Sequence, residues 1–308
     1  MKRLLGVGCG RRMGNSEILL KESMMAAEEK GGIEGEYIHL HDLSLNPCTG
    51  CESCTRSLSK GGTSECWQKD DMVFLKQKFS ECDALILSAP VFELRPPGLY
   101  CIMSDRFFGF GPAYLMDVFK RPARPGALIS VGGSDWVQLG LPQMGLALFM
   151  LNFKVVDQMQ EMWAARQGHT LFHEDTVARA HKLGESVAEA LTKDPNEMEF
   201  VAEDKGMCPF CHSNLLLTRG GNIVECPICA IRGNLDMEGT KIRVNWNPDD
   251  IEKIKWRPYG RGVHYKRIMD LHVFFEQNKE KLKPQLERYR NYKDYSKPTK
   301  VKGEADRS

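Results

Sequence analysis

The stretch Gly8-Cys9-Gly10-Arg11-Arg12-Met13-Gly14-Asn15-Ser16 decides the fold, because it links two segments of different periodicity. Residues 2–9 form an apolar run typical of a buried strand, and residues 17–30 have the apolar spacing of a helix. A glycine-rich turn between a strand and a helix offers backbone N–H groups and the positive end of a helix dipole to a phosphate. The stretch therefore predicts a strand, a phosphate-binding loop and a helix, with Arg11 as a charged partner.

Two nucleotide-binding motifs are excluded by the residues of this loop. No lysine follows Gly14, as a P-loop requires, and Met13 stands where the dinucleotide fingerprint has a glycine. An ordinary glycine-rich turn remains the alternative for the loop taken alone, since such loops are a weak signal.

Strands and helices alternate on both sides of the phosphate loop. Further strands are predicted at residues 36–40, 84–89, 127–131 and 154–159, and helices at 70–81 and 174–191. Five strands with interleaved helices are typical of an α/β fold with a doubly wound parallel sheet.

Two more loops follow predicted strands. Pro90, Val91 and Phe92 end the third strand, and Gly132-Gly133-Ser134-Asp135 ends the fourth. Ligands of open α/β sheets bind outside the carboxyl ends of the strands, where these loops and the phosphate loop would meet. The three loops predict a mononucleotide pocket.

Residues 1–192 resemble the NADPH-dependent FMN reductase family of flavodoxin-like proteins, and more closely its iron-sulfur flavoprotein branch. The resemblance implies a flavodoxin-like fold that binds FMN. It assigns the phosphate to the loop at residues 8–16 and the flavin ring to residues 89–94 and 132–135. The FMN-binding residues expected from it are Gly8, Cys9, Arg11, Gly14, Asn15, Ser16, Pro90, Val91, Phe92, Glu93, Leu94, Gly132, Gly133, Ser134 and Asp135.

Two details of the resemblance concern single residues. Relatives commonly read Gly-Ser-Pro-Arg where this chain has Gly-Cys-Gly-Arg, so the thiol of Cys9, a weaker donor, replaces a hydroxyl. Asp105-Arg106 also matches the family pattern and is expected to be a structural ion pair.

The first cysteine group is Cys48-x2-Cys51-x2-Cys54, with Cys66 further along the chain. Such a compact loop suits a [4Fe-4S] cluster that takes a fourth thiolate from nearby. Iron-sulfur flavoproteins carry a similar motif, although the 11 residues between Cys54 and Cys66 exceed their usual spacing. A structural zinc site and free thiols are the alternatives. The family resemblance also implies a homodimer or homotetramer.

The second cysteine group is Cys208-Pro209-Phe210-Cys211 and Cys226-Pro227-Ile228-Cys229. Two such knuckles form a four-thiolate site, and zinc is the default metal because small modules gain folding energy from it. A rubredoxin-like iron is the alternative. Rubredoxins usually have glycine after each knuckle, where this chain has His212 and Ala230. We expect His212 at the surface and not as a ligand.

The chain is expected to divide into several parts. These are a flavodoxin-like domain at 1–193 with a cysteine-rich loop at 47–66, a linker at 194–206, a zinc-ribbon-like module at 207–246, a helical segment at 247–290 and a disordered tail at 291–308. The helix at 264–289 is expected to break at Pro284.

Charge and hydropathy limit the partners. The 308 residues include 42 Lys and Arg against 41 Asp and Glu, so the net charge of +1 favours neither nucleic acid nor an anionic membrane. No apolar run is long enough to span a bilayer and no signal peptide begins the chain, so a cytoplasmic protein is expected. Basic and aromatic residues within 253–267 leave nucleic-acid binding as a minor alternative.

We therefore expect a flavoenzyme that transfers electrons between NAD(P)H or a ferredoxin-like carrier, FMN and a [4Fe-4S] cluster. Its acceptor is expected to be a small molecule or a protein. The flavin carries the chemistry, so no catalytic side chain is expected. The alternative is a non-enzymatic redox sensor or electron carrier whose zinc ribbon docks a partner.

Overall fold

A five-stranded parallel sheet with the order β2-β1-β3-β4-β5 organises the chain. The computed structural model describes residues 1–308 except 64, 111–120, 203–207, 256, 293–295 and 297–308. The strands are β1 (Lys2–Gly8), β2 (Ile33–His39), β3 (Ala84–Pro90), β4 (Arg124–Val131) and β5 (Phe153–Glu161). This order is the flavodoxin-like one, so the predicted fold class is confirmed.

The strand register brings the loops of the predicted pocket together. Gly8 pairs with Ser88 of the neighbouring strand, and Val131 pairs with both Pro90 and Glu161. All strands are parallel, so the chain leaves β1, β3, β4 and β5 at one edge of the sheet.

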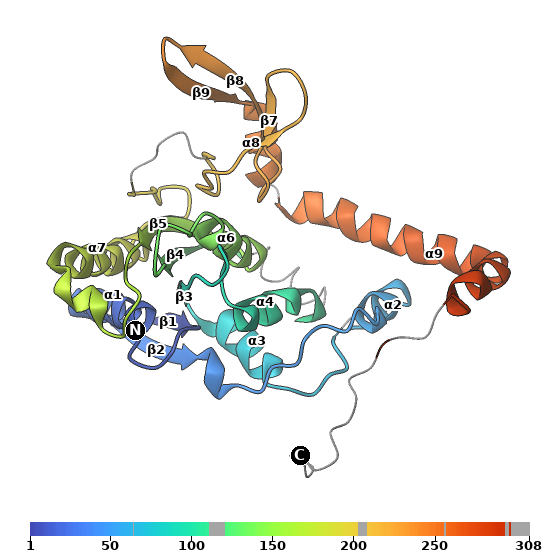
Figure 1. Ribbon diagram of the computed structural model, residues 1–308, viewed down its shortest axis with the longest axis horizontal. Coiled ribbons are helices and arrows are strands. Elements are labelled where there is room, and N and C mark those ends of the chain that lie inside the picture. Colours follow the sequence, from blue (N-terminus) through green and yellow to red (C-terminus); the bar gives the residue numbers. More distant parts are fainter. Residues whose placement is uncertain (64, 111–120, 203–207, 256, 293–295, 297–308) are drawn as a thin grey trace.

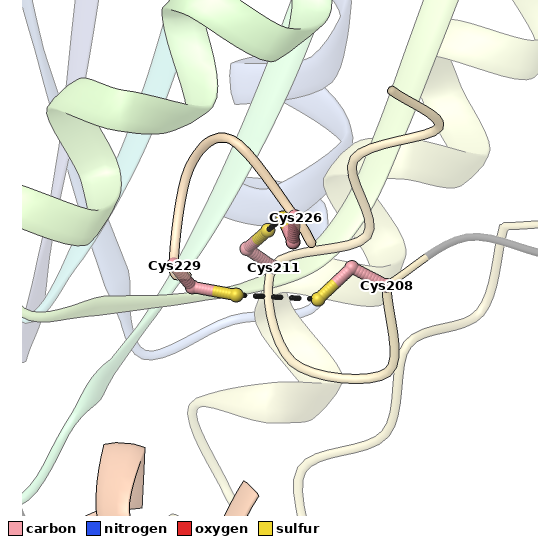
Figure 2. Close-up of side chains that lie close together, drawn as sticks. All are labelled: Cys208, Cys211, Cys226 and Cys229. Atoms are coloured by element: carbon pink, nitrogen blue, oxygen red, sulfur yellow. Dashed lines mark hydrogen bonds between the residues drawn. The ribbon is translucent and has the colours of Figure 1, made fainter. Parts of the chain in front are cut away.

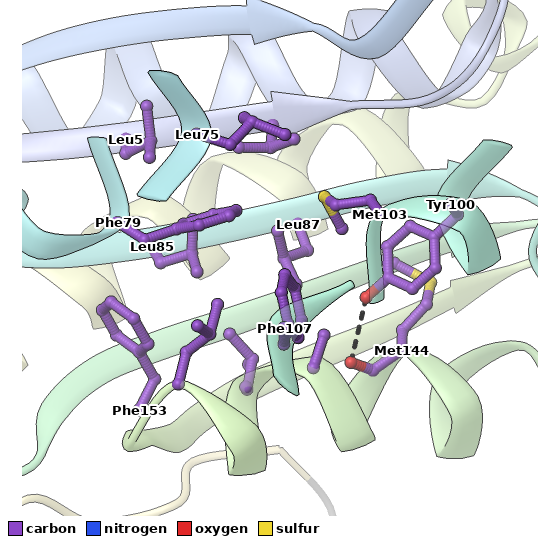
Figure 3. Close-up of a cluster of buried hydrophobic side chains, with 14 of the residues drawn as sticks. Leu5, Leu75, Phe79, Leu85, Leu87, Tyr100, Met103, Phe107, Met144 and Phe153 are labelled. Atoms are coloured by element: carbon purple, nitrogen blue, oxygen red, sulfur yellow. Dashed lines mark hydrogen bonds between the residues drawn. The ribbon is translucent and has the colours of Figure 1, made fainter. Parts of the chain in front are cut away.

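Helices cover both faces of the sheet (Figure 1). On one face α1 (Asn15–Glu29) and α7 (Glu174–Ala190) pack over β3 and β5. On the other face lie α3 (Met72–Glu81), α4 (Gly98–Asp105) and α6 (Gly140–Met150). Figure 3 shows the core beneath this second layer, where the rings of Phe79 and Phe107 meet edge to face at 5.8 Å. The hydroxyl of Tyr100 donates to the carbonyl oxygen of Met144 at 3.1 Å.

The long connection from β2 to α3 carries the first cysteine group. It contains the short helices η1 (Leu40–Asp42) and α2 (Ser53–Ser59). Two other short helices follow α4 and β5, at η2 (Phe107–Phe110) and η3 (His169–Phe172).

A second, antiparallel sheet follows the flavodoxin-like part. Its strands are β6 (Leu217–Thr218), β7 (Ile223–Glu225), β8 (Arg232–Glu238) and β9 (Lys241–Trp246), paired in that order. The preceding segment packs against the first sheet, since Met198 is buried and its carbonyl oxygen accepts a hydrogen bond from Lys154 at 2.5 Å. The first half of the expected linker is therefore held in place.

The chain continues into α8 (Pro248–Lys255) and the long α9 (Arg257–Arg290). The expected break at Pro284 is wrong, because α9 continues through this residue. Proline there removes one hydrogen bond to a carbonyl that water can reach, since α9 is largely exposed at this point. Figure 1 shows α9 as an arm beside the parallel-sheet body, where it contacts α2.

Two expectations fall mainly outside the described residues. They are the disordered tail, of which only residues 291, 292 and 296 are described, and the basic aromatic stretch at 253–267, most of whose side chains are not. Among the helices of the described residues, none has the length and apolar content needed to cross a bilayer.

Candidate functional site

A cavity of roughly 350 Å³ opens at the carboxyl edge of the parallel sheet. It lies between the loops that follow β1, β3, β4 and β5. Its lining residues are Gly10, Arg11, Gly14, Asn15, Ser16, Pro90, Val91, Phe92, Val131, Gly133, Ala164 and Ala165. The structure thus brings members of all three predicted loops into one pocket.

Several residues assigned to FMN by resemblance lie beside this pocket instead of lining it. These are Gly8, Cys9, Glu93, Leu94, Gly132, Ser134 and Asp135. Cys9 is 1 % exposed and packs in the core, and its N–H donates to the carbonyl oxygen of Ser88 at 3.0 Å. Burial raises the pKa of the Cys9 thiol to about 12, so this side chain is a neutral packing group.

The start of α1 leaves donors for an anion. The N–H groups of Asn15, Ser16 and Glu17 stand in the first helical turn, and none of them has an acceptor among the described residues. Gly10 allows the loop to close tightly, because a Cβ at this position would lie 2.3 Å from Oγ of Ser16. The loop therefore directs unpaired N–H groups and the positive end of the α1 dipole at the pocket.

The side chain of Asn15 connects this loop to the one after β5. Its Nδ2 donates to the carbonyl oxygens of Ala164 at 2.6 Å and Arg166 at 2.7 Å, while Oδ1 accepts from the N–H of Thr170 at 3.2 Å. All of its hydrogen-bonding groups are engaged within the protein, which leaves only its backbone N–H for a ligand. Sequence reasoning missed the role of Ala164 and Ala165, although their place after the fifth strand was a usable signal.

Three of the loops that form the pocket carry an exposed aromatic side chain, and of these three Phe92 lines the pocket. Phe92 follows β3, Trp136 follows β4, and Trp163 follows β5, with exposed fractions of 61 %, 65 % and 59 %. The turn after Phe92 is strained, because Glu93 and Leu94 both have positive φ values, 50° and 70°. Strain of this kind in non-glycine residues is concentrated at functional sites.

The four cysteines of the first group line one small cavity despite their uneven spacing. This cavity, of roughly 50 Å³, is lined by Cys48, Cys51, Cys54, Cys66 and residues around them, including Asp105, Arg106 and Gly109. The N–H of Cys66 donates to the carbonyl oxygen of Gly109 at 2.9 Å. Because Gly109 lines the same cavity, this bond holds Cys66 beside the other three cysteines.

The environment of Cys51 favours its thiolate form. Ser53 lies with Oγ 2.9 Å from Sγ of Cys51, and Nε1 of Trp67 donates to the same sulfur at 3.2 Å. These contacts, with that of Ser53 first, lower the pKa of Cys51 to about 6. Thiols that bind metals must be deprotonated, so Cys51 is suited to metal binding, whereas burial raises the pKa of Cys54.

Arg106 pairs with Asp70 and not with its neighbour Asp105. The Nη1 atom of Arg106 lies 2.8 Å from Oδ2 of Asp70, and the two side chains are 2 % and 1 % exposed. The expected pairing with Asp105 is therefore wrong, because the end of α4 directs Arg106 inward and leaves Asp105 exposed. Hydrogen bonds from Arg106 and from two backbone N–H groups outweigh the effect of burial and lower the pKa of Asp70.

The second cysteine group forms a closed site (Figure 2). All four sulfur atoms lie within 4.8 Å of one another, with Cys208 and Cys229 at 3.3 Å and Cys211 and Cys226 at 3.4 Å. A tetrahedral metal with bonds of about 2.3 Å needs sulfur atoms about 3.8 Å apart, so a small adjustment accommodates it. These residues fit a single metal ion.

The two knuckles share one backbone conformation. The N–H of His212 donates to the carbonyl oxygen of Cys208, and the N–H of Ala230 donates to that of Cys226, both at 2.9 Å. His212 and Ala230 have φ values of 57° and 61°, the region that favours glycine. The repeated geometry confirms that the knuckles are equivalent.

The expected surface position of His212 is wrong. The residue is 7 % exposed, and its ring stacks on Phe200 with centroids 3.7 Å apart and an interplanar angle of 3°. Its carbonyl oxygen accepts from Nε2 of Gln158 in β5 at 3.2 Å. His212 thus packs the cysteine module against the parallel sheet, a contact between distant segments that the sequence does not reveal.

Known proteins match both the sheet and the cysteine module. The family model for NADPH-dependent FMN reductases matches residues 1–169. A flavone synthase, cfoJ, from Aspergillus candidus is 27 % identical over 264 residues, which cover 76 % of this chain and 78 % of the relative. An iron-sulfur flavoprotein from Archaeoglobus fulgidus is 36 % identical over 141 residues, covering 46 % of this chain and 56 % of the relative.

A solved structure described as a flavone reductase superposes with a TM-score of 0.77 at 27 % identity, covering 96 % of this chain and 100 % of its own. The family match spans the parallel sheet and every loop that lines the pocket. The chain therefore belongs to the NADPH-dependent FMN reductase family and is an FMN-dependent oxidoreductase.

Proposed function

We propose that this oxidoreductase takes electrons from NAD(P)H or a reduced carrier and transfers them, with FMN and a [4Fe-4S] cluster as cofactors, to a planar aromatic enone of the flavone class. The observation that carries the proposal is the pocket at the carboxyl edge of the sheet, whose lining includes Asn15 and Ser16, with their unpaired N–H groups, and the aromatic ring of Phe92.

The phosphate of FMN would be held by the start of α1. The N–H groups of Asn15, Ser16 and Glu17, with the guanidinium of Arg11, supply the donors and positive charge that an anion needs. Pro90, Val91, Phe92 and Gly133 offer apolar and backbone contacts for the ring. The other residues that the resemblance assigns to FMN do not line the pocket and would instead stabilise the loops that do. These residues are Gly8, Cys9, Glu93, Leu94, Gly132, Ser134 and Asp135. When bound, FMN supplies hydride and single-electron chemistry.

The first cysteine group would hold the iron-sulfur cluster. A buried polar atom supports this assignment, because Nε of Arg106 has no hydrogen-bond acceptor among the described residues although Arg106 lines the cavity of the four cysteines. A cluster at Cys48, Cys51, Cys54 and Cys66 would supply sulfur acceptors and one-electron chemistry there. Residues 48–66 lie within the segment matched by the family model, and the Archaeoglobus relative carries the name iron-sulfur flavoprotein.

The second cysteine group would hold a structural zinc ion. All four cysteines are buried and the site is closed, as is typical of structural zinc. The same four thiolates could bind a rubredoxin-like iron, so metal analysis must decide between the two metals.

The acceptor is inferred from the exposed aromatic side chains of the pocket loops and from the relatives. Phe92, Trp136 and Trp163 offer flat apolar surfaces that suit stacking against a planar aromatic molecule. Two relatives that align with most of the chain are named a flavone synthase and a flavone reductase. In the overall reaction, NAD(P)H and a proton would saturate the carbon–carbon double bond of the enone and release NAD(P)⁺.

We also propose that the chain forms a homodimer or homotetramer. The apolar side chains of Leu271, Phe274 and Phe275 lie three and four residues apart on α9, and all three are at least half exposed. A helical arm with an exposed apolar stripe gains stability when a partner covers the stripe. A second copy of the chain is the occupant that the family resemblance favours.

One anaerobic preparation tests the cofactors. We expect about one FMN per chain, about four iron and four sulfide, and about one zinc. Colourless protein that takes up no added FMN would overturn the proposal, whereas iron in place of zinc would reassign only the second cysteine group.

Turnover tests the acceptor. We expect NADPH oxidation to accelerate on addition of a flavone and a saturated product to form in equal amount. Equal rates with flavone and with no acceptor, beside fast dye reduction, would reject the flavone class and leave the flavoenzyme intact.

A further inference from the structure

We infer that Arg106 is the positioning residue of the first cysteine group: it holds Cys66 in place and directs a further N–H at the iron-sulfur cluster, which raises the reduction potential of that cluster. This inference rests on the cluster proposed above. It assigns a role to a residue that no cysteine motif includes.

Arg106 is buried together with a single carboxylate. Its Nη1 lies 2.8 Å from Oδ2 of Asp70, and its Nη2 donates to Oδ1 of the same residue at 3.2 Å. A buried guanidinium requires compensation of this kind, because removing one partner leaves an unpaired charge in the interior. The pair therefore fixes the orientation of the guanidinium plane.

This ion pair joins the two ends of the cysteine-rich loop. The Nη1 atom of Arg106 also donates to the carbonyl oxygen of Asn46 at 2.5 Å, and Asp70 accepts from the N–H of Asn46 at 2.9 Å. Asn46 stands two residues before Cys48, and Asp70 stands four residues after Cys66. One buried pair thus holds the ends of a loop that contains all four cysteines.

Arg106 contacts one cysteine directly. Its Nη2 lies 3.4 Å from Sγ of Cys66, whose N–H is bound to the carbonyl oxygen of Gly109. Cys66 is therefore held through its side chain and its backbone. The contact explains how a cysteine separated by a long, glycine-containing spacer can join the other three.

The Nε atom of Arg106 indicates which kind of group would occupy the cavity. It is buried without a hydrogen-bond acceptor among the described residues, and Arg106 lines the cavity with the four cysteines. Burying a donor without an acceptor is unfavourable, so a purely structural arginine would be expected to have this group satisfied. A sulfide or thiolate sulfur of a bound cluster is the acceptor that this chemistry fits.

The consequence is a shift in redox potential. One-electron reduction makes the cluster and its thiolates more negative, and N–H donors with a fixed positive charge stabilise the more negative state. Arg106 therefore favours the reduced form. Substitutions that keep the loop folded but remove this donor should make the cluster harder to reduce.

The test compares Arg106→Lys with the wild-type chain as purified anaerobically with its cofactors. Lysine keeps the charge that Asp70 needs but loses Nε and the planar fork. Iron, sulfide and FMN are measured per chain, and the midpoint potential is followed by electron paramagnetic resonance during titration with dithionite. We expect unchanged FMN and either a negative shift of the potential or a loss of more than half of the iron.

The matched control is Arg179→Lys, because Arg179 also forms an ion pair with a buried carboxylate, that of Asp157, but contacts no cysteine in the described chain. It should leave iron and potential unchanged. If Arg106→Lys fails to fold, Asp70→Asn combined with Arg106→Gln removes both charges together and is measured in the same way. Wild-type iron and potential in the Arg106 variants would overturn the inference, whereas wild-type protein without iron would overturn the cluster itself.

Discussion

The side-chain nitrogen of Asn15 lies 2.6 Å from the carbonyl oxygen of Ala164, although 149 residues separate the two positions. This hydrogen bond fastens the phosphate-loop side of the pocket to the loop after β5. Because Asn15 is 6 % exposed, water does not replace the bond readily when it is lost. One buried amide group therefore links the two walls of the pocket.

Replacing Asn15 with alanine should lower the free energy of unfolding by about 2–3 kcal/mol, because buried carbonyl groups lose their donors. Urea denaturation of the FMN-free protein measures this change. The control is Gln167→Ala, which removes an exposed hydrogen bond from Gln167 to Arg12 between the same two loops and should cost less than about 0.5 kcal/mol. Similar losses in both variants would contradict the role given to Asn15.

The sequence predicted the loop that contains Asn15 but not the hydrogen bonds that its side chain forms. Glycines and an arginine between a strand and a helix are local signals, so the fold class and the sheet edge that carries the pocket could be predicted from the sequence. The partners of Asn15, Arg106 and His212 are distant in sequence, and their contacts arise only when the sheet and its connections are assembled. Burial of these polar residues was therefore not visible in any local pattern.

Arg11 and Arg12 are adjacent but differ in position, which gives a direct test of the phosphate site. Arg11 lines the pocket, whereas Arg12 pairs with Asp42 at 2.5 Å outside it. Arg11→Ala should weaken FMN binding about tenfold through the loss of one charge-assisted contact, and Arg12→Ala should change it little. Fluorescence titration of FMN-free protein measures both affinities. Equal effects would show that the phosphate lies elsewhere.

Glu17 should make the fold sensitive to acid. Burial opposes ionisation of this carboxylate, but hydrogen bonds from Lys21 and from the N–H of Met13 outweigh it and hold the pKa below the ordinary 4.5. A lowered pKa adds stability at neutral pH that is lost as the pH falls from about 4.5 through the folded-state value.

The comparison that isolates this effect uses Glu17→Gln. Between pH 7 and pH 3.5 the wild-type chain should lose more unfolding free energy than the variant, as measured by urea titration at each pH. Glu34→Gln, at an exposed position in β2, should follow the wild type. If the unfolding free energies of Glu17→Gln and of the wild type fall by the same amount between pH 7 and pH 3.5, this contribution of Glu17 is excluded.

Ala230 occupies a backbone conformation that costs energy in any residue except glycine. Its φ of 61° lies in the left-handed region, where alanine is disfavoured by about 1 kcal/mol. Ala230→Gly should therefore stabilise the cysteine module and slow the release of its metal to a chelator. Ala26→Gly in the middle of α1 should instead destabilise the chain by about 1 kcal/mol. Faster metal release from Ala230→Gly than from wild type would refute the claim that the backbone of Ala230 is strained.

The apolar stripe on α9 should govern assembly. Leu271 is 66 % exposed and Phe274 is 64 % exposed, so neither contributes a large buried surface to the single chain. Changing both to glutamate should yield a monomer by light scattering on a sizing column, because charge opposes burial of the stripe between copies. Gln277→Glu adds charge to the same helix without removing apolar surface, and this variant should keep the wild-type mass and FMN content. A double variant of wild-type mass would place the subunit interface on another part of the chain.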